Sequence, residues 1–357
     1  MPEKVTISLW NFISVIAIGF LLVLCWQLRS LIIILMIAVV IAATLAPAIA
    51  MAQKLGIPRW LSVIGVYLGI IGGLTGVGLL IGPTVVEQIE RLIRRLPIYL
   101  EILRSLIEDL ILRLGMIDPD SSGMISQLLD INGLSSWAIR SSQQLVVSSY
   151  SVTKGIIGSV FSLLLALLLS GYMLSASEKL LQDIINLFPF PWNKRLALQI
   201  RPVSQRMGGY IQGRILVSAI LGIVISISLN FLGLADFALG LGVIAGFTNL
   251  IPFFGPVLGS IPALIVAIAQ GGLTALWVLL LFTIVQNLET YVLDPLLVGN
   301  SVKVHPLYQL LAVLGGAQVL GIVGALIVPP WVAGSAVLLE NLYVQPKLSI
   351  EQKASIE

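Results

Sequence analysis

The sequence contains one cysteine, Cys25, and one histidine, His305, in 357 residues. A single cysteine excludes a disulfide framework and a thiolate metal cluster, and a single histidine excludes a multi-histidine metal site. Charged residues make up only 10% of the chain, whereas a soluble domain carries about 25%. So few charges cannot cover a soluble surface of this size. The composition therefore excludes an ordinary soluble enzyme, a disordered chain and a nucleic-acid-binding domain.

The sequence also lacks the motifs of common enzyme classes. It has no Gly-rich phosphate loop ending in Lys-Ser or Lys-Thr, and its histidine belongs to no recognisable nucleophile motif. We therefore expect no enzyme activity, no cofactor, no bound metal and no nucleic-acid partner.

Hydrophobic residues, by contrast, make up 58% of the chain. A helix needs about 20 predominantly apolar residues to cross a bilayer. Such runs lie at 8–28, 31–51, 60–82, 155–174, 215–232 and 273–293. This pattern predicts an all-α, polytopic membrane protein. Its predicted partner is the lipid bilayer in which it is embedded.

The charges divide the chain into six predicted regions. These are transmembrane helices 1–3 at 1–84, an extracytoplasmic helical insert at 85–154, a fourth span at 155–176, a basic cytoplasmic insert at 177–214, a transport unit at 215–340 and a cytoplasmic tail at 341–357. Basic residues in the 53–60 loop and in the 177–214 insert place both loops and both termini in the cytoplasm by the positive-inside rule. The outer insert carries an amphipathic stripe, which fits either a helix folded onto its own protomer or membrane, or a seam between subunits.

Two uncharged segments have the wrong length for one span. Residues 238–270 would form a helix of about 50 Å, well above the roughly 30 Å hydrocarbon core. Residues 306–339 form a second uncharged segment that is too long for one straight span. Each segment follows a full span, and we predict two re-entrant helical hairpins in inverted span-plus-hairpin units. Single tilted spans are the alternative. The predicted tip residues are Pro252, Gly255, Pro256 and Gly259 in the first hairpin, and Gly315, Gly316 and Gly321 in the second.

Polar side chains inside these apolar segments are the candidate solute ligands. Charge within a span is costly and usually marks function. Glu289 shares a helix face with Gln286, and the alternative is that it reaches the interface or pairs with Lys303. The alternative for the residues at the two tips is capping of helix ends. The predicted substrate-binding residues are Thr248, Asn249, Gln286, Asn287, Glu289 and Gln318.

Two motifs resemble the autoinducer-2 exporter family of bacterial membrane proteins. One is Ile-Pro-Phe-Phe-Gly-Pro-Val-Leu-Gly-Ser-Ile-Pro at 251–262, and the other is Asp-Pro-Leu-Leu-Val-Gly-Asn-Ser-Val-Lys-Val-His-Pro at 294–306. Asp294 departs from the common pattern of the family, so no role is carried onto it. The resemblance implies a multi-pass plasma-membrane transporter that works by an elevator-type motion. It also implies a homo-oligomer, namely a pentamer.

Three functions are compatible with the sequence. The first is a secondary transporter exporting a small polar solute, of which autoinducer-2 is the example that the resemblance implies. The second is a sodium/proton antiporter, a monovalent-cation carrier in which Glu289 is the exchanging carboxylate. The third is a membrane scaffold that transports nothing.

Overall fold

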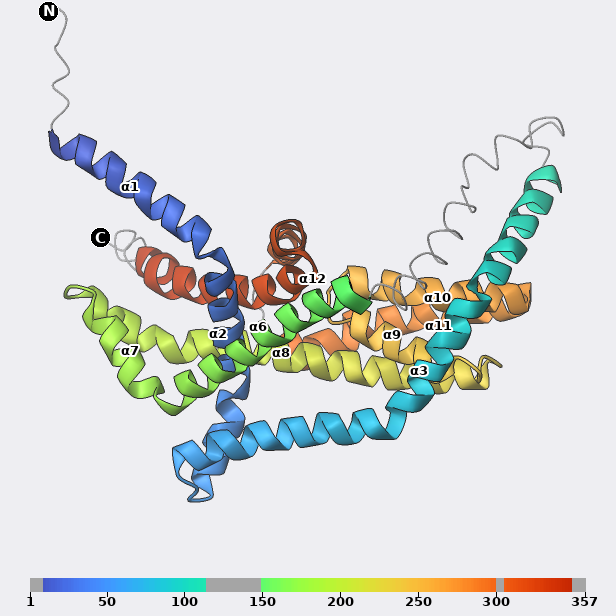
Figure 1. Cartoon of the computed structure of the whole chain (residues 1–357), viewed down its shortest axis with the longest axis horizontal. Helices are drawn as coiled ribbons and strands as arrows, with labels where there is room; N and C mark the ends of the chain where they lie inside the picture. The colour runs from blue at the N-terminus through green and yellow to red at the C-terminus, as the bar shows by residue number, and fades with distance from the viewer. Residues whose placement is uncertain (1–8, 114–148, 300–304, 349–357) are drawn as a thin grey trace, which may run out of the picture.

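The computed structural model describes residues 9–113, 149–299 and 305–348, and every regular element in these ranges is a helix (Figure 1). Part of the predicted outer insert, at 114–148, and part of the predicted tail, at 349–357, lie outside the described residues, as does Lys303. The helices are α1 Leu9–Gln27, α2 Arg29–Lys54, α3 Arg59–Arg113, α6 Ser149–Ser175, α7 Ser177–Asn186, α8 Trp192–Phe231, α9 Ala238–Thr248, α10 Phe254–Gln270, α11 Gly272–Leu288, the π-helix η2 Glu289–Val298, α12 Pro306–Leu339 and the short π-helix η4 Glu340–Val344.

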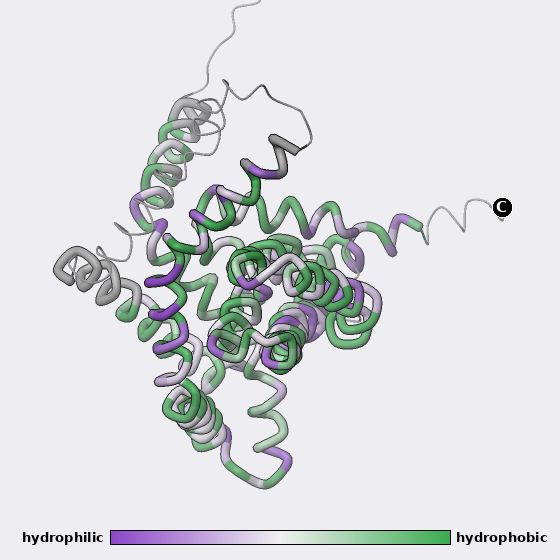
Figure 2. The backbone as a smooth tube through the Cα atoms, turned by 90° about the vertical axis from the view of Figure 1, so that its right-hand side faces the viewer, coloured by the Kyte–Doolittle hydropathy of each residue, from purple (hydrophilic) through white to green (hydrophobic). Residues whose placement is uncertain are grey.

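The described helices fit a multi-pass membrane protein. Five of them are long and apolar enough to cross a bilayer, and the pair α6 and α7, bent by 84°, makes a sixth if it counts as one span. The five are Arg29–Lys54, Arg59–Ile107, Trp192–Phe231, Gly272–Val298 and Pro306–Leu348. Hydrophobic residues cover most of their length (Figure 2). Many large apolar side chains on them are exposed, as expected where lipid rather than water is the solvent.

Two predicted boundaries fall inside continuous helices. The third span and the amphipathic stripe of the outer insert form one 55-residue helix, α3, which changes direction between its apolar and its charged part (Figure 1). The basic segment and the fifth span likewise form the 40-residue helix α8. A helix passes from water into lipid without a break because its backbone hydrogen bonds are already satisfied internally.

The segment 238–270 folds into two helices packed side by side. α9 and α10 are joined by a turn that includes Phe253, whose φ of 67° is left-handed and rare for a bulky residue. Gly255 faces the backbone of Thr248, and a side chain there would collide with the Thr248 carbonyl. Pro256 and Gly259 lie inside α10 rather than in an irregular tip. The break is therefore narrower than predicted.

The segment 306–339 also folds back on itself, at one residue. Gly321 has φ 66° and ψ −151°, outside the helical range, and the two halves of α12 meet there. Gly316 and Gly324 touch backbone to backbone across this bend. Gly315 and Gly316 are thus helical, and the turn lies at Gly321. The placement of both hairpins within a bilayer stays a prediction.

The charged part of α3 lies over the end of the first hairpin at which α9 begins. The Gln88 side chain accepts a 2.7 Å hydrogen bond from the Gly240 amide at the start of α9. Phe237 packs edge-on against Tyr99, with ring centroids 6.3 Å apart, and under the Arg95 guanidinium at 5.7 Å. The described part of the outer insert therefore packs on its own chain.

The main core joins α8 to the hairpin and to α11. Val217 and Leu221 of α8, Leu241 of α9 and Val266 of α10 are at most 2% exposed. Close packing of α8 against α9 depends on glycine, since a side chain at Gly246 would meet the Ser218 carbonyl at 3.0 Å. This core holds the hairpin tip beside the one deeply buried charge cluster of the described chain.

Candidate functional site

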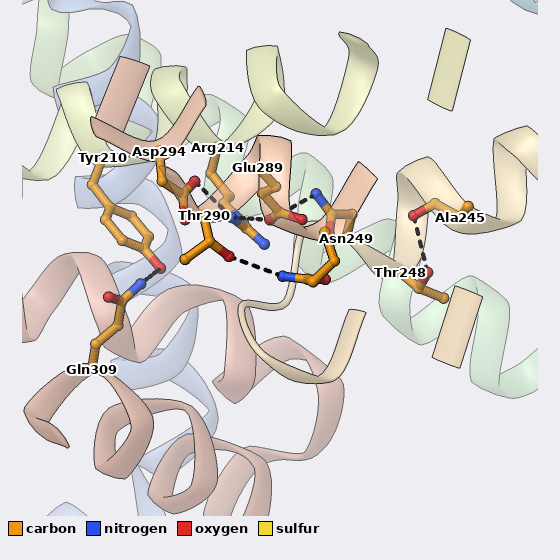
Figure 3. A network of polar contacts seen from close by, with 10 residues as sticks. Tyr210, Arg214, Ala245, Thr248, Asn249, Glu289, Thr290, Asp294 and Gln309 are labelled. Atoms are coloured by element: carbon orange, nitrogen blue, oxygen red, sulfur yellow. Dashed lines mark hydrogen bonds and ion pairs between the residues drawn. The ribbon is translucent and has the colours of Figure 1, made fainter. Parts of the chain in front are cut away.

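Arg214 lies where α8 passes from its basic to its apolar part, and it is only 4% exposed. Its Nη1 atom contacts Glu289 Oε1 at 2.9 Å and Asp294 Oδ1 at 3.3 Å (Figure 3). Both carboxylates come from η2, which packs against α8. One guanidinium nitrogen thus bridges two acidic side chains of a neighbouring helix.

Glu289 is the first residue of η2 and is 3% exposed. Its Oε1 atom also accepts a 3.2 Å hydrogen bond from Asn249 Nδ2, and Asn249, also 3% exposed, directly follows α9 (Figure 3). The ion pair and the amide therefore connect α8, the hairpin tip and η2. π-helical turns inside helices occur often at functional sites.

Two further hydrogen bonds surround the cluster. Gln286 Nε2 donates to Thr290 Oγ1 at 3.2 Å, one turn apart along the joined helices α11 and η2. On the other side, Gln309 Nε2 of α12 donates to the Tyr210 hydroxyl of α8 at 3.4 Å (Figure 3). The second hairpin is thus linked to the same face of α8.

The cluster contains buried polar atoms without a partner in the described structure. They are Arg214 Nε, Arg214 Nη2, Ser218 Oγ and Gln286 Oε1. Leaving one such group unpaired costs about 1–3 kcal/mol, and more where the group is charged. The two arginine atoms form one edge of the guanidinium, the edge that can donate two parallel hydrogen bonds to a pair of oxygens. The site therefore has unused capacity for a polar ligand.

A cavity of about 10 Å³ lies between the hairpin tip and α11. Its polar lining is Asn249, Gln286 and Glu289, and its apolar lining includes Leu221, Phe282 and Pro256. This volume is close to the minimum for a single water molecule. The cavity is therefore too small for a solute larger than water in this conformation.

Two larger hollows are open to the side and are lined mainly by apolar residues. One, of about 940 Å³, lies against α2, α6, α8 and α12, and the other, of about 570 Å³, lies against α3, α8 and α9. Apolar grooves on the lipid-facing side of a membrane protein suit lipid chains or other helices. The small polar cavity is therefore the better candidate for a polar solute.

The structure brings together three of the predicted ligands and separates the others. Asn249, Gln286 and Glu289 line one cavity. Thr248 donates its hydroxyl to the carbonyls of its own helix at 2.9 and 3.0 Å. Asn287 lies on the exposed side of α11 and donates to the Thr283 carbonyl at 2.7 Å. Gln318 is exposed near the bend of α12 and does not line the cavity.

The sequence analysis missed Arg214 and Asp294. Arg214 was placed at the end of the basic cytoplasmic insert, and no role was carried onto Asp294. The structure buries the Arg214 side chain, and the helix that follows α11 continues through Asp294 to Val298. A usable signal existed, since 215–302 contains three acids and no Lys or Arg. A buried Glu289 needed a basic partner, and Arg214 directly precedes that stretch. In the part of the chain described, no three His, Cys, Asp or Glu side chains form a metal-binding group.

Comparison with known proteins identifies the family. The model of the AI-2E family transporters matches residues 12–343. The chain belongs to this family. It is 29% identical to the Bacillus subtilis protein named "Putative transport protein YrrI" over 95% of this chain and 97% of that protein. The Escherichia coli protein named "Putative permease PerM" is 26% identical over 78% of each chain. The resemblance carried by the two motifs is thus confirmed, and the family supports a membrane transporter.

Proposed function

We propose that this AI-2E family protein is a secondary transporter that exports a small polar solute across the bacterial plasma membrane by alternating access. The observation that carries the proposal is the closed, buried cluster of Arg214, Glu289, Asn249 and Gln286, with polar atoms left unpaired. Sites of secondary transporters lie where broken helices meet near the middle of the membrane. Autoinducer-2 is the first solute to test, because the chain belongs to the AI-2E family.

The proposed motion is of the elevator type and moves the hairpins relative to the remaining helices. It is supported by the breaks in the helices at Phe253 and Gly321, and the glycine contacts show that α9 packs closely against α8. We also propose cytoplasmic termini and a homo-oligomer, a pentamer by family resemblance. Exposed apolar side chains such as Ile16 and Phe20 of α1 suit contact with lipid or with a second copy.

The proposed function is tested with the purified protein in liposomes. We expect efflux of a polar solute from a panel that includes autoinducer-2, at a rate that ion gradients change. The double variant Asn249→Ala, Gln286→Ala should lower that rate at least tenfold, because both amides line the cavity. Ser260→Ala, whose hydroxyl bonds only within α10, is the control. If no solute or cation moves, the protein is a scaffold.

The hairpin placement predicts an accessible junction. Gly272 begins α11 and has no atoms within 4 Å of the space where a side chain would lie. In a Cys25→Ser background, Gly272→Cys should react with a membrane-impermeant thiol reagent from the extracellular side of intact cells. Lys54→Cys, in the predicted cytoplasmic loop, should react only after permeabilisation. Labelling of Gly272→Cys only after permeabilisation would contradict the re-entrant first hairpin.

A cation/proton antiporter is the second candidate function, favoured by the formal charge of −1 of one arginine with two carboxylates. The variant Glu289→Gln distinguishes a solute exporter from a cation/proton antiporter. An exporter of a neutral solute should keep transport within about tenfold of wild type, because glutamine preserves the hydrogen-bonding shape but removes the charge. Proton flux driven by a sodium gradient should vanish in an antiporter. The control is Glu178→Gln, which removes a carboxylate that is 85% exposed.

A further inference from the structure

The chain bends sharply at the end of the predicted fourth span. Helix α7 leaves α6 at an angle of 84°. Arg59, the first residue of α3, holds this bend. Its guanidinium donates to the Leu174 carbonyl at 2.8 Å and to the Ser177 hydroxyl, and it pairs with Glu178 at 3.0 Å. Helix α7 therefore begins beside the start of α3, at the boundary predicted to face the cytoplasm, and runs nearly perpendicular to α6.

Helix α7 is amphipathic, and its apolar face borders a groove. Its exposed polar residues include Gln182 and Asp183. Its apolar residues line an open groove of about 230 Å³ between α7 and the first turns of α8. The lining is mainly apolar and includes Leu181, Phe188 and Ile200. An amphipathic helix that lies across the end of a span is typical of a segment in the membrane interface.

The connection from α7 to α8 carries an exposed apolar surface and projects at the left of Figure 1. Leu187 is 81% exposed, Phe190 is 74% exposed and Trp192 is 48% exposed. Contact of such a surface with water is unfavourable. Aromatic side chains, tryptophan above all, are enriched where lipid meets water. The connection therefore suits a partner that offers it an apolar surface.

Basic side chains are interleaved with this apolar surface. The Lys194 ammonium lies 5.5 Å from the centre of the Phe190 ring, and the Arg195 guanidinium lies 5.8 Å from the centre of the Trp192 ring. Residues 177–201 contain four basic and two acidic residues, and one of the acids already has a salt bridge to α3. The surface is therefore complementary to a partner that is both apolar and anionic. Anionic phospholipids have both properties, and they attract clusters of Lys and Arg that lie next to a span.

We propose that the connection and the start of α8 form a membrane-interface anchor that binds anionic phospholipids. The side chains of Leu187, Phe190 and Trp192 contact the boundary of the acyl chains, and Lys194 and Arg195 bind the lipid phosphates. The open groove beside α7 takes part of an acyl chain. The anchor holds the basic end of α8 at the bilayer surface. This inference adds a lipid partner at a defined surface and does not depend on which solute the protein transports.

The test locates the connection relative to the bilayer in the full chain. In a Cys25→Ser background, Leu187→Cys is labelled with a nitrobenzoxadiazole fluorophore, and the protein is reconstituted into phosphatidylcholine vesicles with or without phosphatidylglycerol. Lipids that carry a spin label near the headgroup quench the fluorophore only where it lies in the interface. We expect strong quenching with phosphatidylglycerol, weak quenching without it, and a decrease in high salt, which screens the attraction. Each basic side chain near an anionic surface strengthens the attraction about fivefold, so Lys194→Glu with Arg195→Glu should lower the ratio of quenched to unquenched label about 25-fold.

The matched control is Lys194→Arg with Arg195→Lys, which keeps both charges and should keep the quenching. Gln182→Cys, on the exposed polar side of α7, carries the same fluorophore and should stay unquenched in both kinds of vesicle. All of these side chains are exposed, so each variant should unfold at the same temperature as wild type in detergent. Equal quenching of the Leu187→Cys label with and without phosphatidylglycerol overturns the preference for anionic lipid. The absence of quenching in both kinds of vesicle overturns the anchor itself and leaves the surface to a protein partner.

Discussion

Replacing Arg214 with leucine is expected to be among the most damaging single substitutions in the chain. The guanidinium is 4% exposed and is the cation that both Glu289 and Asp294 contact. Removing one partner of a buried ion pair leaves an uncompensated buried charge and costs about 3–5 kcal/mol. We expect Arg214→Leu to lower the midpoint of thermal unfolding in detergent sharply and to abolish transport.

The double variant Arg214→Leu, Glu289→Leu distinguishes loss of charge balance from loss of packing. Replacing both members of a buried pair with apolar residues of similar volume is often close to neutral, so most of the lost stability should return while transport stays absent. Arg94→Leu is the control, because Arg94 and Glu90 are 71% and 59% exposed and such surface pairs contribute about 0–1 kcal/mol. A double variant no more stable than Arg214→Leu would show that the pair does not determine stability.

The first hairpin shows what the sequence alone predicts well. Uncharged length together with Pro252 and Gly255 indicated a break in 238–270, and the chain turns between Thr248 and Phe254. The sequence also marked Glu289 as a charge within an apolar run, with a position at the interface as the alternative, and the structure buries it. These features are local: proline removes a donor, glycine permits tight approach, and a charge in an apolar run has few tolerable positions.

The ion pairs of Arg214 with Glu289 and Asp294 could not be predicted from local sequence features. A helix that runs unbroken from a basic segment into an apolar one carries no local mark of where burial begins, and only the packing of η2 on α8 settles it. The predicted span at 273–293 also ended too early, directly before Asp294 and Pro295. A proline normally ends a regular helix because it lacks the N–H donor, but here the π-helical register of η2 changes which groups pair, and the helix continues to Val298. Asp294 thereby faces Arg214.

The bend of α12 yields the second prediction of large effect. Gly316 and Gly324 face each other across it: a Cβ on Gly316 would lie 2.6 Å from the Gly324 carbonyl carbon, and one on Gly324 would lie 2.7 Å from the Gly316 carbonyl carbon. These neighbours are backbone atoms, which cannot rotate away as a side chain can. Gly316→Ala and Gly324→Ala should each cost about 1–3 kcal/mol as overpacking, or force the two halves of α12 apart, with loss of transport.

Gly315→Ala is a control on the adjacent residue. It has no atoms within 4 Å of its virtual side chain, and alanine is favoured over glycine inside a helix by roughly 0.5–1 kcal/mol, so this variant should be as stable as wild type or more stable. Gly321→Ala tests backbone conformation alone, because the space around Gly321 is open but its φ of 66° and ψ of −151° form a combination that essentially only glycine adopts. A residue with a Cβ atom held there costs about 1–3 kcal/mol. The measurement is the free energy of unfolding of Gly315→Ala, Gly316→Ala, Gly321→Ala and Gly324→Ala, all in the same detergent. Equal stability of Gly315→Ala and Gly324→Ala would mean that the two halves of α12 do not meet at this contact, and that the segment crosses as a single span.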